Sequence, residues 1–414
     1  MDTIPAIEKY TLEKHSGKVS CQITPPSSKS ESNRVLIIDA LGGMKSDLQN
    51  LSNARDTQTM IRLLKSDEKT LDVLDAGTTM RFLTAFTAIT GRETIMTGTK
   101  RMRERPIKLL VDALKTLGAD INYLENDGYP PIEIQPFNKD AVKTNHIKIR
   151  GDVSSQYITA LLMTGPLLPN GLILELEGKI GSRPYIEMTL SLMSHFGVRA
   201  NWKENLIEIP NQEYKAASYK VESDWSAASY WYSVLALSKE GKINLEGYKS
   251  DSFQGDRSIV DIMKNLGVKT TFTSTGLLLE KTDIYQEFTY DFTHSPDLAQ
   301  TIAVICAAKG ISATLSGLES LRIKETDRIA AIQNELRKFG ADLIEIEKDV
   351  TYKVAPGNFA VDGQTVSTYK DHRMAMAFAP LALLGNLSIE NPEVVDKSYP
   401  DYWKDLQLAG FQLA

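Results

Sequence analysis

The sequence predicts an α/β protein built from six repeated units, which divide into two lobes of three units each. Three observations support this prediction: a series of helical segments that each follow an aspartate, a second helix series that alternates with the first, and short β-rich runs between them. Self-similarity at a regular period indicates a repeated structural unit. The length of 414 residues also exceeds one ordinary core and is typical of about two domains.

The first helix series begins after aspartates that recur every 72 to 77 residues. Each precedes small or polar residues and then an apolar helical run; the five are Asp75, Asp152, Asp224, Asp297 and Asp371. An aspartate in this place accepts hydrogen bonds from first-turn amides, so we interpret these residues as helix caps. The free amides beside a cap favour anions. Asp224 has no cation beside it and is expected to be a structural cap alone.

The second helix series consists of amphipathic segments that each end in a hydrophobic residue, a glycine and a strand-like run. These segments are 105–123, 183–202, 256–272 and 327–346. We expect their glycines to adopt the left-handed backbone that ends a helix. The glycines are Gly118, Gly197, Gly267 and Gly340. Segments that follow Ser28 and Asp56 resemble the two series at a shorter spacing, and counting them gives the sixth unit.

Composition excludes several classes of protein. A net charge of −6 argues against a general nucleic-acid or membrane-surface binder, because such proteins usually carry a basic face. The two cysteines, Cys21 and Cys306, provide neither a disulfide framework nor a cysteine-rich metal site, and Cys306 is expected in the core. No secretory signal is visible, and the uncharged run 157–174 is expected to be a helix, a turn and a strand. We therefore expect a cytoplasmic protein without membrane or nucleic-acid partners.

Cations nevertheless cluster beside several helix starts. The most specific cluster, residues 25–34, places Lys29, Ser30 and Arg34 at a helix start. An ammonium and a planar guanidinium together suit a phosphate or a carboxylate. Further cations lie in segments 101–106, 321–328, 369–376 and 397–403. These clusters predict sites for small molecules that carry several negative charges.

Nine segments follow one another along nearly the whole chain: SSKSESNR, DAGTTMRFL, RMRERPI, GDVSSQYITALLM, SRPYIEMTL, SPDLAQTIA, RIKETDR, YKDHRMAM and DKSYPDYW. Together they resemble the 3-phosphoshikimate 1-carboxyvinyltransferase (EPSP synthase) family. The resemblance implies a two-lobed inside-out α/β barrel, each lobe with three βαβαββ units, that closes over its substrates. It also implies a discontinuous first lobe, residues 1–25 and 223–414, and an inserted second lobe, residues 26–222.

The resemblance implies transfer of the enolpyruvyl group of phosphoenolpyruvate to the 5-hydroxyl of shikimate 3-phosphate, with release of phosphate. Both substrates carry a phosphate and a carboxylate, which accounts for many local cations in an acidic protein. The residues implied to bind shikimate 3-phosphate are Lys29, Ser30, Arg34, Ser154, Ser155, Gln156, Ser182, Tyr185, Asp297, Ser320 and Lys324. Those implied to bind phosphoenolpyruvate are Lys29, Gly77, Arg105, Gln156, Glu325, Arg328, Arg373 and Lys397.

The same resemblance implies the catalytic groups. Asp297 matches the base for the attacking hydroxyl, Glu325 matches the residue that protonates the methylene carbon, and Lys29 is also implied as catalytic. Carboxylates set among cations suit proton transfer, and the cations would stabilise the charge of a tetrahedral intermediate. No metal or organic cofactor is required, and we expect a monomer. Because Gly77 lacks a side chain, we also expect glyphosate to enter the phosphoenolpyruvate pocket.

Two positions depart from the family pattern. Asp75 and Ser320 stand where the family often has asparagine, and Asp75 adds a negative charge near an expected anion site. His372 stays open between catalysis and structural support.

The sequence fits two other functions less well. The UDP-N-acetylglucosamine enolpyruvyl transferases share the fold and the donor, but they usually carry a cysteine in a mobile loop, and neither Cys21 nor Cys306 has such a setting. A non-catalytic repeat scaffold would predict repeated surface aromatic residues, whereas different ionisable groups occupy successive helix starts here. Both alternatives rank below the EPSP synthase interpretation.

Overall fold

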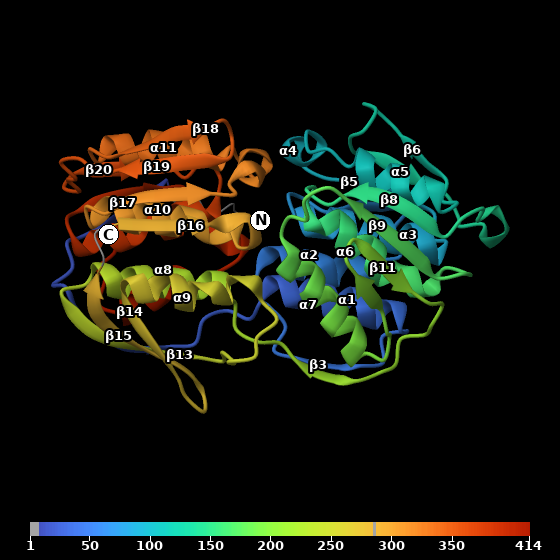
Figure 1. Ribbon diagram of the computed structural model, residues 1–414, viewed down its shortest axis with the longest axis horizontal. Coiled ribbons are helices and arrows are strands. Elements are labelled where there is room, and N and C mark those ends of the chain that lie inside the picture. The colour runs from blue at the N-terminus through green and yellow to red at the C-terminus, as the bar shows by residue number, and fades with distance from the viewer. Residues whose placement is uncertain (1–7, 285–286) are drawn as a thin grey trace, which may run out of the picture. The chain divides into compact units, whose positions relative to one another are not determined.

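The structure, a computed structural model, describes residues 8–284 and 287–414. The chain divides into two compact units, which we call the terminal unit (1–27 and 222–414) and the inserted unit (28–221). This division lies beside the boundaries at 25/26 and 222/223 that the resemblance implies. Each unit combines helices with several small sheets (Figure 1). Within the part of the chain that is described, no helix is long and apolar enough to cross a membrane.

The inserted unit contains two complete βαβαββ repeats and one reduced repeat. The first comprises β4 (Thr70–Asp72), α3 (Gly77–Thr90), β5 (Thr94–Thr97), α5 (Lys108–Thr116), β6 (Ile121–Tyr123) and β7 (Ile132–Ile134). The second comprises β8 (His146–Arg150), α6 (Ser155–Thr164), β9 (Leu172–Glu177), α7 (Arg183–His195), β10 (Asn201–Lys203) and β11 (Leu206–Ile209). The reduced repeat comprises α1 (Lys29–Leu41), β3 (Asp47–Gln49), α2 (Arg55–Leu64) and β12 (Ser218–Lys220). It lacks the final hairpin, which explains the shorter spacing seen in the sequence.

The terminal unit contains three repeats. The first comprises β2 (Lys18–Ile23), α8 (Trp225–Leu237), β13 (Glu240–Glu246), α9 (Ile259–Asn265), β14 (Leu266–Phe272) and β15 (Gly276–Ile284). The second comprises β16 (Glu287–Asp291), α10 (Ala299–Ala308), β17 (Ser312–Ser316), α11 (Arg328–Lys338), β18 (Asp342–Glu347) and β19 (Thr351–Ala355). The third comprises β20 (Gln364–Val366), α12 (His372–Phe378), β21 (Leu387–Glu390), α13 (Tyr402–Leu408) and β1 (Lys9–Leu12). The inserted unit interrupts the first repeat between β2 and α8.

All four complete four-stranded sheets have the same topology. The strand orders are β4-β5-β7-β6, β8-β9-β11-β10, β2-β13-β15-β14 and β16-β17-β19-β18. In each sheet the first two strands are parallel, and the remaining pairings are antiparallel. This register is that of a βαβαββ unit, so the predicted fold class is confirmed, with the reduced repeat as its variation.

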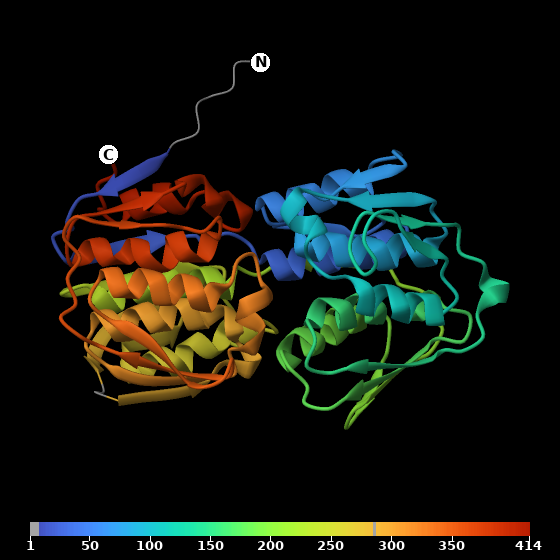
Figure 2. The same ribbon diagram turned by 90° about the horizontal axis from the view of Figure 1, so that it is seen from above.

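The first helix series is buried, which explains why its apolar residues surround the whole helix. In α8 every residue but Ser226 is buried, in α10 every residue but Ala308 is buried, and α12 is buried along its whole length. A helix that is apolar all round belongs inside a core. In Figure 1, α8 lies between the sheet of β13–β15 and the sheet that includes β16, and Figure 2 shows the helices of each unit from above. The helices are therefore inside and the sheets outside.

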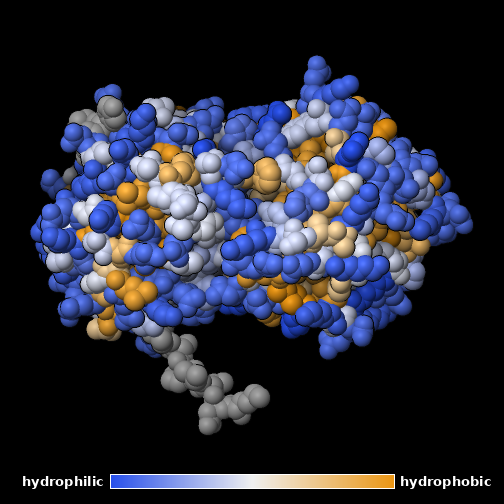
Figure 3. All heavy atoms as spheres, turned by 90° about the horizontal axis from the view of Figure 1, so that it is seen from below, coloured by the Kyte–Doolittle hydropathy of each residue, from blue (hydrophilic) through white to orange (hydrophobic). Residues whose placement is uncertain are grey.

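The face of the molecule seen in Figure 3 is mostly hydrophilic. On the face seen in Figure 3, hydrophobic residues form separate patches among hydrophilic ones. Such scattered exposure is normal for a folded protein and indicates no function by itself.

The predicted aspartate caps are only partly correct. Asp224 caps α8 by accepting a hydrogen bond from the Ala227 amide, and Asp371 caps α12 in the same way. The prediction is wrong for Asp75 and Asp152, because α3 has Ala76 at its N-cap and α6 is capped by Ser154. Asp75 instead binds Arg55, and Asp152 binds Arg150. Asp297 does not cap a helix either and lies in a 3-10 turn ahead of α10.

The predicted helix ends are confirmed. The four glycines that end the second series all have positive φ, between 83° and 99°. In α5, α7 and α11 the amide of the glycine donates to a carbonyl of the last turn, as the left-handed cap requires. Cys306 lies in the core, and the uncharged run 157–174 forms a helix, a 3-10 turn and a strand, as predicted.

Candidate active site

Arg328 is the centre of a polar cluster in the terminal unit. It is the first residue of α11, and its side chain is only 2% exposed. Its guanidinium donates through Nε to Asp371 at 2.7 Å, through Nη1 to Asp297 at 2.9 Å and through Nη2 to Glu325 at 2.7 Å. Burial alone would lower the pKa of Arg328, but the three carboxylates raise it above its usual value. The arginine is therefore a fixed positive charge.

Asp297 lies between two arginines. Besides the bond from Arg328, it accepts a hydrogen bond from Nη2 of Arg373 at 2.9 Å, and the ammonium of Lys324 lies 3.7 Å away. Burial raises the pKa of Asp297, but the charges of Arg373, Lys324 and Arg328 outweigh it and hold the pKa well below its usual range. Asp297 is therefore ionised at neutral pH.

Glu325 joins the cluster to the C-terminal part of the chain. Its second carboxylate oxygen lies 3.9 Å from Nζ of Lys397, which is buried at the end of the 3-10 segment Pro392–Lys397. We call the following seven residues the carboxylate–cation cluster: Asp297, Lys324, Glu325, Arg328, Asp371, Arg373 and Lys397. The cluster contains four cations and three carboxylates. Its excess positive charge suits the binding of an anion.

Asp256 is a member of this region that sequence reasoning missed. Its buried carboxylate accepts a hydrogen bond from the Ser226 hydroxyl, and that hydroxyl also accepts one from Arg373 at 3.4 Å. Burial, followed by the negative charge of Asp297, raises the pKa of Asp256 to about 7. In the sequence Asp256 was counted only as the start of a helical segment. The sequence signal that could have identified Asp256 is its position next to Arg257 at the start of that segment.

His372 and Ser320 lie in two separate segments of the terminal unit. His372 is buried in α12, with Nδ1 3.7 Å from the Asp371 carboxylate. His372 is therefore a buried neighbour of Asp371. Ser320 lies in the 3-10 segment Glu319–Ile323. Arg322 of the same segment pairs with Asp327, so part of the charge in segment 321–328 is structural.

In the inserted unit, Lys29 is held by a buried carboxylate. The N-cap of α1 is Ser28, whose hydroxyl accepts a hydrogen bond from the Glu31 amide, so Lys29 occupies the first helical position. Its ammonium donates to Asp56 of α2 at 3.1 Å, and Asp56 is only 3% exposed. Sequence reasoning used Asp56 only to mark a helix start and missed this contact. The partner could not be read from spacing, because packing of α1 on α2 creates it.

Arg34 was predicted to bind a substrate, but its side chain is buried. Its guanidinium donates to Thr189 at 2.9 Å, to Thr159 at 3.3 Å and to the Ser30 carbonyl at 2.8 Å. The ring of Tyr185 lies 5.9 Å from its Cζ. Burial lowers the pKa of Arg34 to about 10, which leaves it charged at neutral pH. Arg34 therefore links α1, α6 and α7.

Gly77 and Arg105 lie against each other. Gly77 is the first residue of α3, and a Cβ built on it would lie 2.7 Å from Nη1 of Arg105. The guanidinium therefore approaches the helix start at a distance that only glycine allows. The neighbouring Arg101 and Arg103 pair with surface glutamates, and the structure does not bring them to this contact.

The remaining predicted residues lie at two helix starts of the inserted unit. Ser154 caps α6 through its hydroxyl, which accepts from the Gln156 amide, and Ser155 is the first helical residue. The Gln156 side chain donates to Thr78 of α3 at 3.0 Å, so the first turns of α3 and α6 lie next to each other. Ser182, with a left-handed φ of 50°, is the N-cap of α7 and precedes Tyr185 by one turn.

Helix starts, buried cations and paired carboxylates in two α/β units define a protein that binds small, multiply anionic molecules and can transfer protons. Among the described residues, histidine, cysteine and carboxylate side chains form no group of three suited to a metal ion.

The chain belongs to the EPSP synthase (3-phosphoshikimate 1-carboxyvinyltransferase) family, whose model matches residues 14–66 and 65–406. A 3-phosphoshikimate 1-carboxyvinyltransferase of Bacteroides fragilis is 46% identical over 409 residues, covering 97% of this chain and 98% of its own. One of Histophilus somni is 36% identical and covers 97% of this chain and 99% of its own. The similarity therefore runs along nearly the whole length of both chains.

Solved structures give the same fold. An EPSP synthase from Acinetobacter baumannii superimposes with a TM-score of 0.77 at 18% identity, covering 98% of this chain and all of that one. At this identity the likeness establishes the fold alone.

Proposed function

We propose that this protein transfers the enolpyruvyl group of phosphoenolpyruvate to the 5-hydroxyl of shikimate 3-phosphate, giving 5-enolpyruvylshikimate 3-phosphate and phosphate. The observation that carries the proposal is the Asp297 carboxylate, held between Arg328 and Arg373 beside Glu325. This arrangement supports the proposal, because two carboxylates suited to proton transfer lie among positive charges that suit a phosphate and a carboxylate. Family membership supports the same reaction.

Phosphoenolpyruvate is held mainly by fixed cations in this proposal. Arg328 uses three of its five N–H groups for carboxylates, which leaves donors for a ligand. Arg373, Lys397 and Arg105 supply further charge, and Gln156 and the Gly77 backbone complete the set. The cations would stabilise charge as the tetrahedral intermediate forms and collapses.

Asp297 acts as the base for the 5-hydroxyl, and Glu325 protonates the methylene carbon. Without substrate, the surrounding cations keep the basicity of Asp297 low. Anionic substrates would neutralise part of that positive charge, so the pKa of Asp297 should rise when they bind. The base would then become effective only in the loaded enzyme.

Shikimate 3-phosphate is assigned mainly to the inserted unit. Ser154, Ser155 and Gln156 offer hydroxyls, an amide and the amides of the α6 start, and such a start favours phosphate. Lys29, Ser30, Arg34, Ser182 and Tyr185 complete the set there, and Asp297, Ser320 and Lys324 complete it from the terminal unit. We further propose a cytoplasmic monomer that uses no cofactor.

The nearest rival reaction uses UDP-N-acetylglucosamine as acceptor. Burial raises the pKa of Cys21 to about 11 and also raises the pKa of Cys306, so neither thiol suits a reactive loop cysteine. The deciding measurement is phosphate release from phosphoenolpyruvate with each acceptor separately. We expect release with shikimate 3-phosphate alone; release with only the sugar nucleotide would overturn the proposal.

A further inference from the structure

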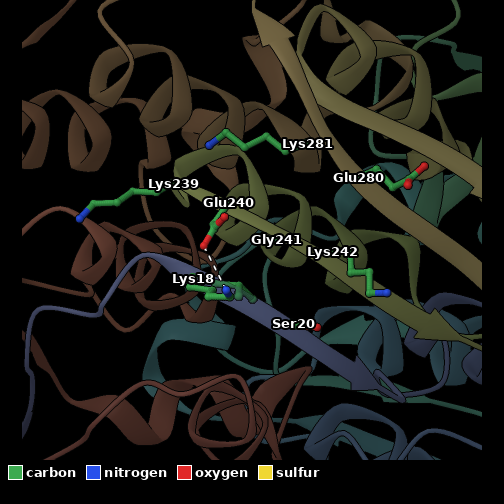
Figure 4. Close-up of a pocket in the computed structure, with 9 residues that line it drawn as sticks. Lys18, Ser20, Lys239, Glu240, Gly241, Lys242, Glu280 and Lys281 are labelled. Atoms are coloured by element: carbon green, nitrogen blue, oxygen red, sulfur yellow. Dashed lines mark ion pairs between the residues drawn. The ribbon is translucent and has the colours of Figure 1, made fainter.

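Two groups of polar residues in the terminal unit lie outside the set proposed to bind substrates. The first lines a hollow of about 490 Å³ beside β2 and β13, and Figure 4 shows its lysines and glutamates. The ion pair drawn there, Lys18–Glu240 at 3.3 Å, is 74% and 66% exposed, so these charges are solvated and contribute little. The second group surrounds the buried Arg373 guanidinium and comprises Ser226, Tyr230 and Asp256.

Arg373 is held by two neutral hydroxyl groups as well as by Asp297. Its Nη1 donates to the Tyr230 hydroxyl at 3.2 Å, and its Nη2 donates to the Ser226 hydroxyl at 3.4 Å. Ser226 and Tyr230 are one turn apart, so they lie on the same face of α8. A hydroxyl orients an arginine without neutralising it, whereas a carboxylate offsets part of the positive charge that an anion would use.

The two hydroxyl contacts matter most when Asp297 changes its charge. As the proposed base, Asp297 takes up a proton, and its hydrogen bond from Arg373 at 2.9 Å then loses the strength that charge gives it. Ser226 and Tyr230 are neutral before and after this step. They can therefore keep the guanidinium in place throughout the reaction.

Asp256 determines how the Ser226 hydroxyl is oriented. A hydroxyl has one proton, and Ser226 donates it to Oδ2 of Asp256, so that its lone pairs are left to accept from Arg373. Asp256 reaches Ser226 because Gln254, two residues earlier, binds the start of α8. The Gln254 side chain accepts a hydrogen bond from the Trp225 amide at 3.0 Å.

The fold itself gains little from Asp256. Its side chain is 3% exposed, and among the described residues its Oδ1 has no hydrogen-bond partner. A buried carboxylate with one hydrogen bond lowers stability, because water would bind both oxygens in the unfolded chain. An under-satisfied buried group of this kind is typical of a functional site, and Ser226 is the group that Asp256 serves.

We propose that Asp256 is a positioning residue for the binding of phosphoenolpyruvate. It fixes the Ser226 hydroxyl as an acceptor, and Ser226 together with Tyr230 sets the orientation of the Arg373 guanidinium. This inference rests on the proposed function, in which Arg373 binds phosphoenolpyruvate. Asp256 acts through Ser226 and does not touch the substrate.

The test compares single and double variants of the full chain. Asp256→Ala and Ser226→Ala should each raise the KM for phosphoenolpyruvate about three- to ten-fold and change kcat less than about two-fold, because a less well oriented guanidinium binds more weakly. The double variant should be no worse than Ser226→Ala alone, since both changes interrupt the same contact. Effects that multiply in the double variant would show that Asp256 does not act through Ser226 and would overturn the proposal.

Two further variants separate the hydrogen bond from charge. Asp256→Asn keeps an oxygen that accepts from Ser226, so it should recover most of the affinity that Asp256→Ala loses. Asp261→Ala removes an exposed carboxylate from α9 and should leave the KM unchanged. The proposal is wrong if Asp256→Asn is as impaired as Asp256→Ala, or if Asp261→Ala raises the KM equally.

Binding without turnover distinguishes this inference from the proposed function. The rise in melting temperature with phosphoenolpyruvate concentration, measured without an acceptor, gives the dissociation constant. That constant should increase about three- to ten-fold in Asp256→Ala and in Ser226→Ala. If the unchanged protein binds phosphoenolpyruvate but transfers nothing to shikimate 3-phosphate, the proposed function fails while these constants still decide the role of Asp256. Equal constants in all three proteins, or no binding by the unchanged protein, would contradict the inference.

Discussion

The guanidinium of Arg105 lies over Gly77, with Nη1 2.7 Å from the point that a Cβ at position 77 would occupy. The contact joins the start of α3 to an arginine that follows the short helix α4 (Lys100–Arg103). Both residues belong to the set proposed for phosphoenolpyruvate. A single methyl group at position 77 would therefore displace the positive charge of Arg105.

We expect Gly77→Ala to raise the KM for phosphoenolpyruvate by about ten-fold, because Arg105 must move away from the added Cβ. The KM for shikimate 3-phosphate should change much less. Steady-state kinetics with each substrate varied in turn would measure both values. An unchanged KM for phosphoenolpyruvate would show that Arg105 does not bind that substrate. The melting temperature serves as the control, since a flexible arginine can shift at little cost to the fold.

The lack of a side chain at Gly77 also bears on glyphosate. We expect millimolar glyphosate to inhibit turnover at low phosphoenolpyruvate, because no side chain at position 77 blocks its entry. The measurement is phosphate release with and without glyphosate. Unchanged turnover under these conditions would refute the expectation.

For Asp297→Asn we expect kcat to fall by about 10²- to 10⁴-fold, since the amide has a similar shape but cannot accept the hydroxyl proton. Phosphoenolpyruvate binding should be kept or tightened, because the variant removes a negative charge between Arg328 and Arg373. Single-turnover kinetics and equilibrium binding separate these two effects. Near-normal turnover would show that Asp297 is not the base.

Asp224→Asn is the matched control for that substitution. Asp224 caps α8 of the same unit, and asparagine caps a helix about as well as aspartate. We therefore expect kcat and the melting temperature to stay close to those of the unchanged protein.

For Asp56→Asn we expect about a ten-fold loss in kcat/KM, because Lys29 loses the charged partner that positions it. The exposed pair Arg55–Asp75 provides the control, at 3.2 Å with 44% and 33% exposure. Arg55→Gln should change stability and activity little, since exposed ion pairs contribute little. Equal effects from the two substitutions would contradict a positioning role for Asp56.

Asp256 should make stability fall as pH rises. Its pKa is about 7 in the folded chain, against 3.8 for an ordinary aspartate, because burial and Asp297 disfavour its charge. The folded chain thus binds this proton more tightly, and the contribution is full below about pH 4 and lost as pH rises through 7. Asp256→Asn carries no charge at either pH. Relative to the unchanged protein, it should gain on the order of 2–4 kcal/mol between pH 5 and 8.

Urea unfolding of both proteins at pH 5 and pH 8 would measure this difference. The Ser226 hydroxyl can donate to asparagine as it does to Asp256, so the local hydrogen bond is kept. A difference in unfolding free energy that is the same at both pH values would show that Asp256 is ionised throughout.

Periodicity was sufficient to predict the repeat, because each helix of the second series must bury one face and each left-handed glycine must end a helix. The choice of cap was less predictable. Asp152 and Ser154 both suit an N-cap, and only the geometry of the turn selects Ser154. Local sequence therefore predicts that a helix starts, but it fixes the first residue only to within one or two positions.

Contacts between distant segments were harder to predict. The bond between Lys29 and Asp56 and the approach of Asp256 to Arg373 through Ser226 depend on how helices pack. No spacing in the sequence encodes those distances. The cations themselves were recognisable, since Arg328 and Arg373 stand at helix starts. Their pairing with Asp297 and Asp371 is visible only in the folded chain.

The insertion between β2 and α8 has a consequence for synthesis on the ribosome. β2 emerges early, but its parallel neighbour β13 emerges only after the whole of Ser28–Val221 has been made. The inserted unit, continuous in sequence, can complete its sheets first, whereas β2 must wait as an unpaired edge. β1 waits longer still, because its partner β21 is made near the end of the chain. The terminal unit therefore cannot complete its sheets in the order in which its residues are synthesised.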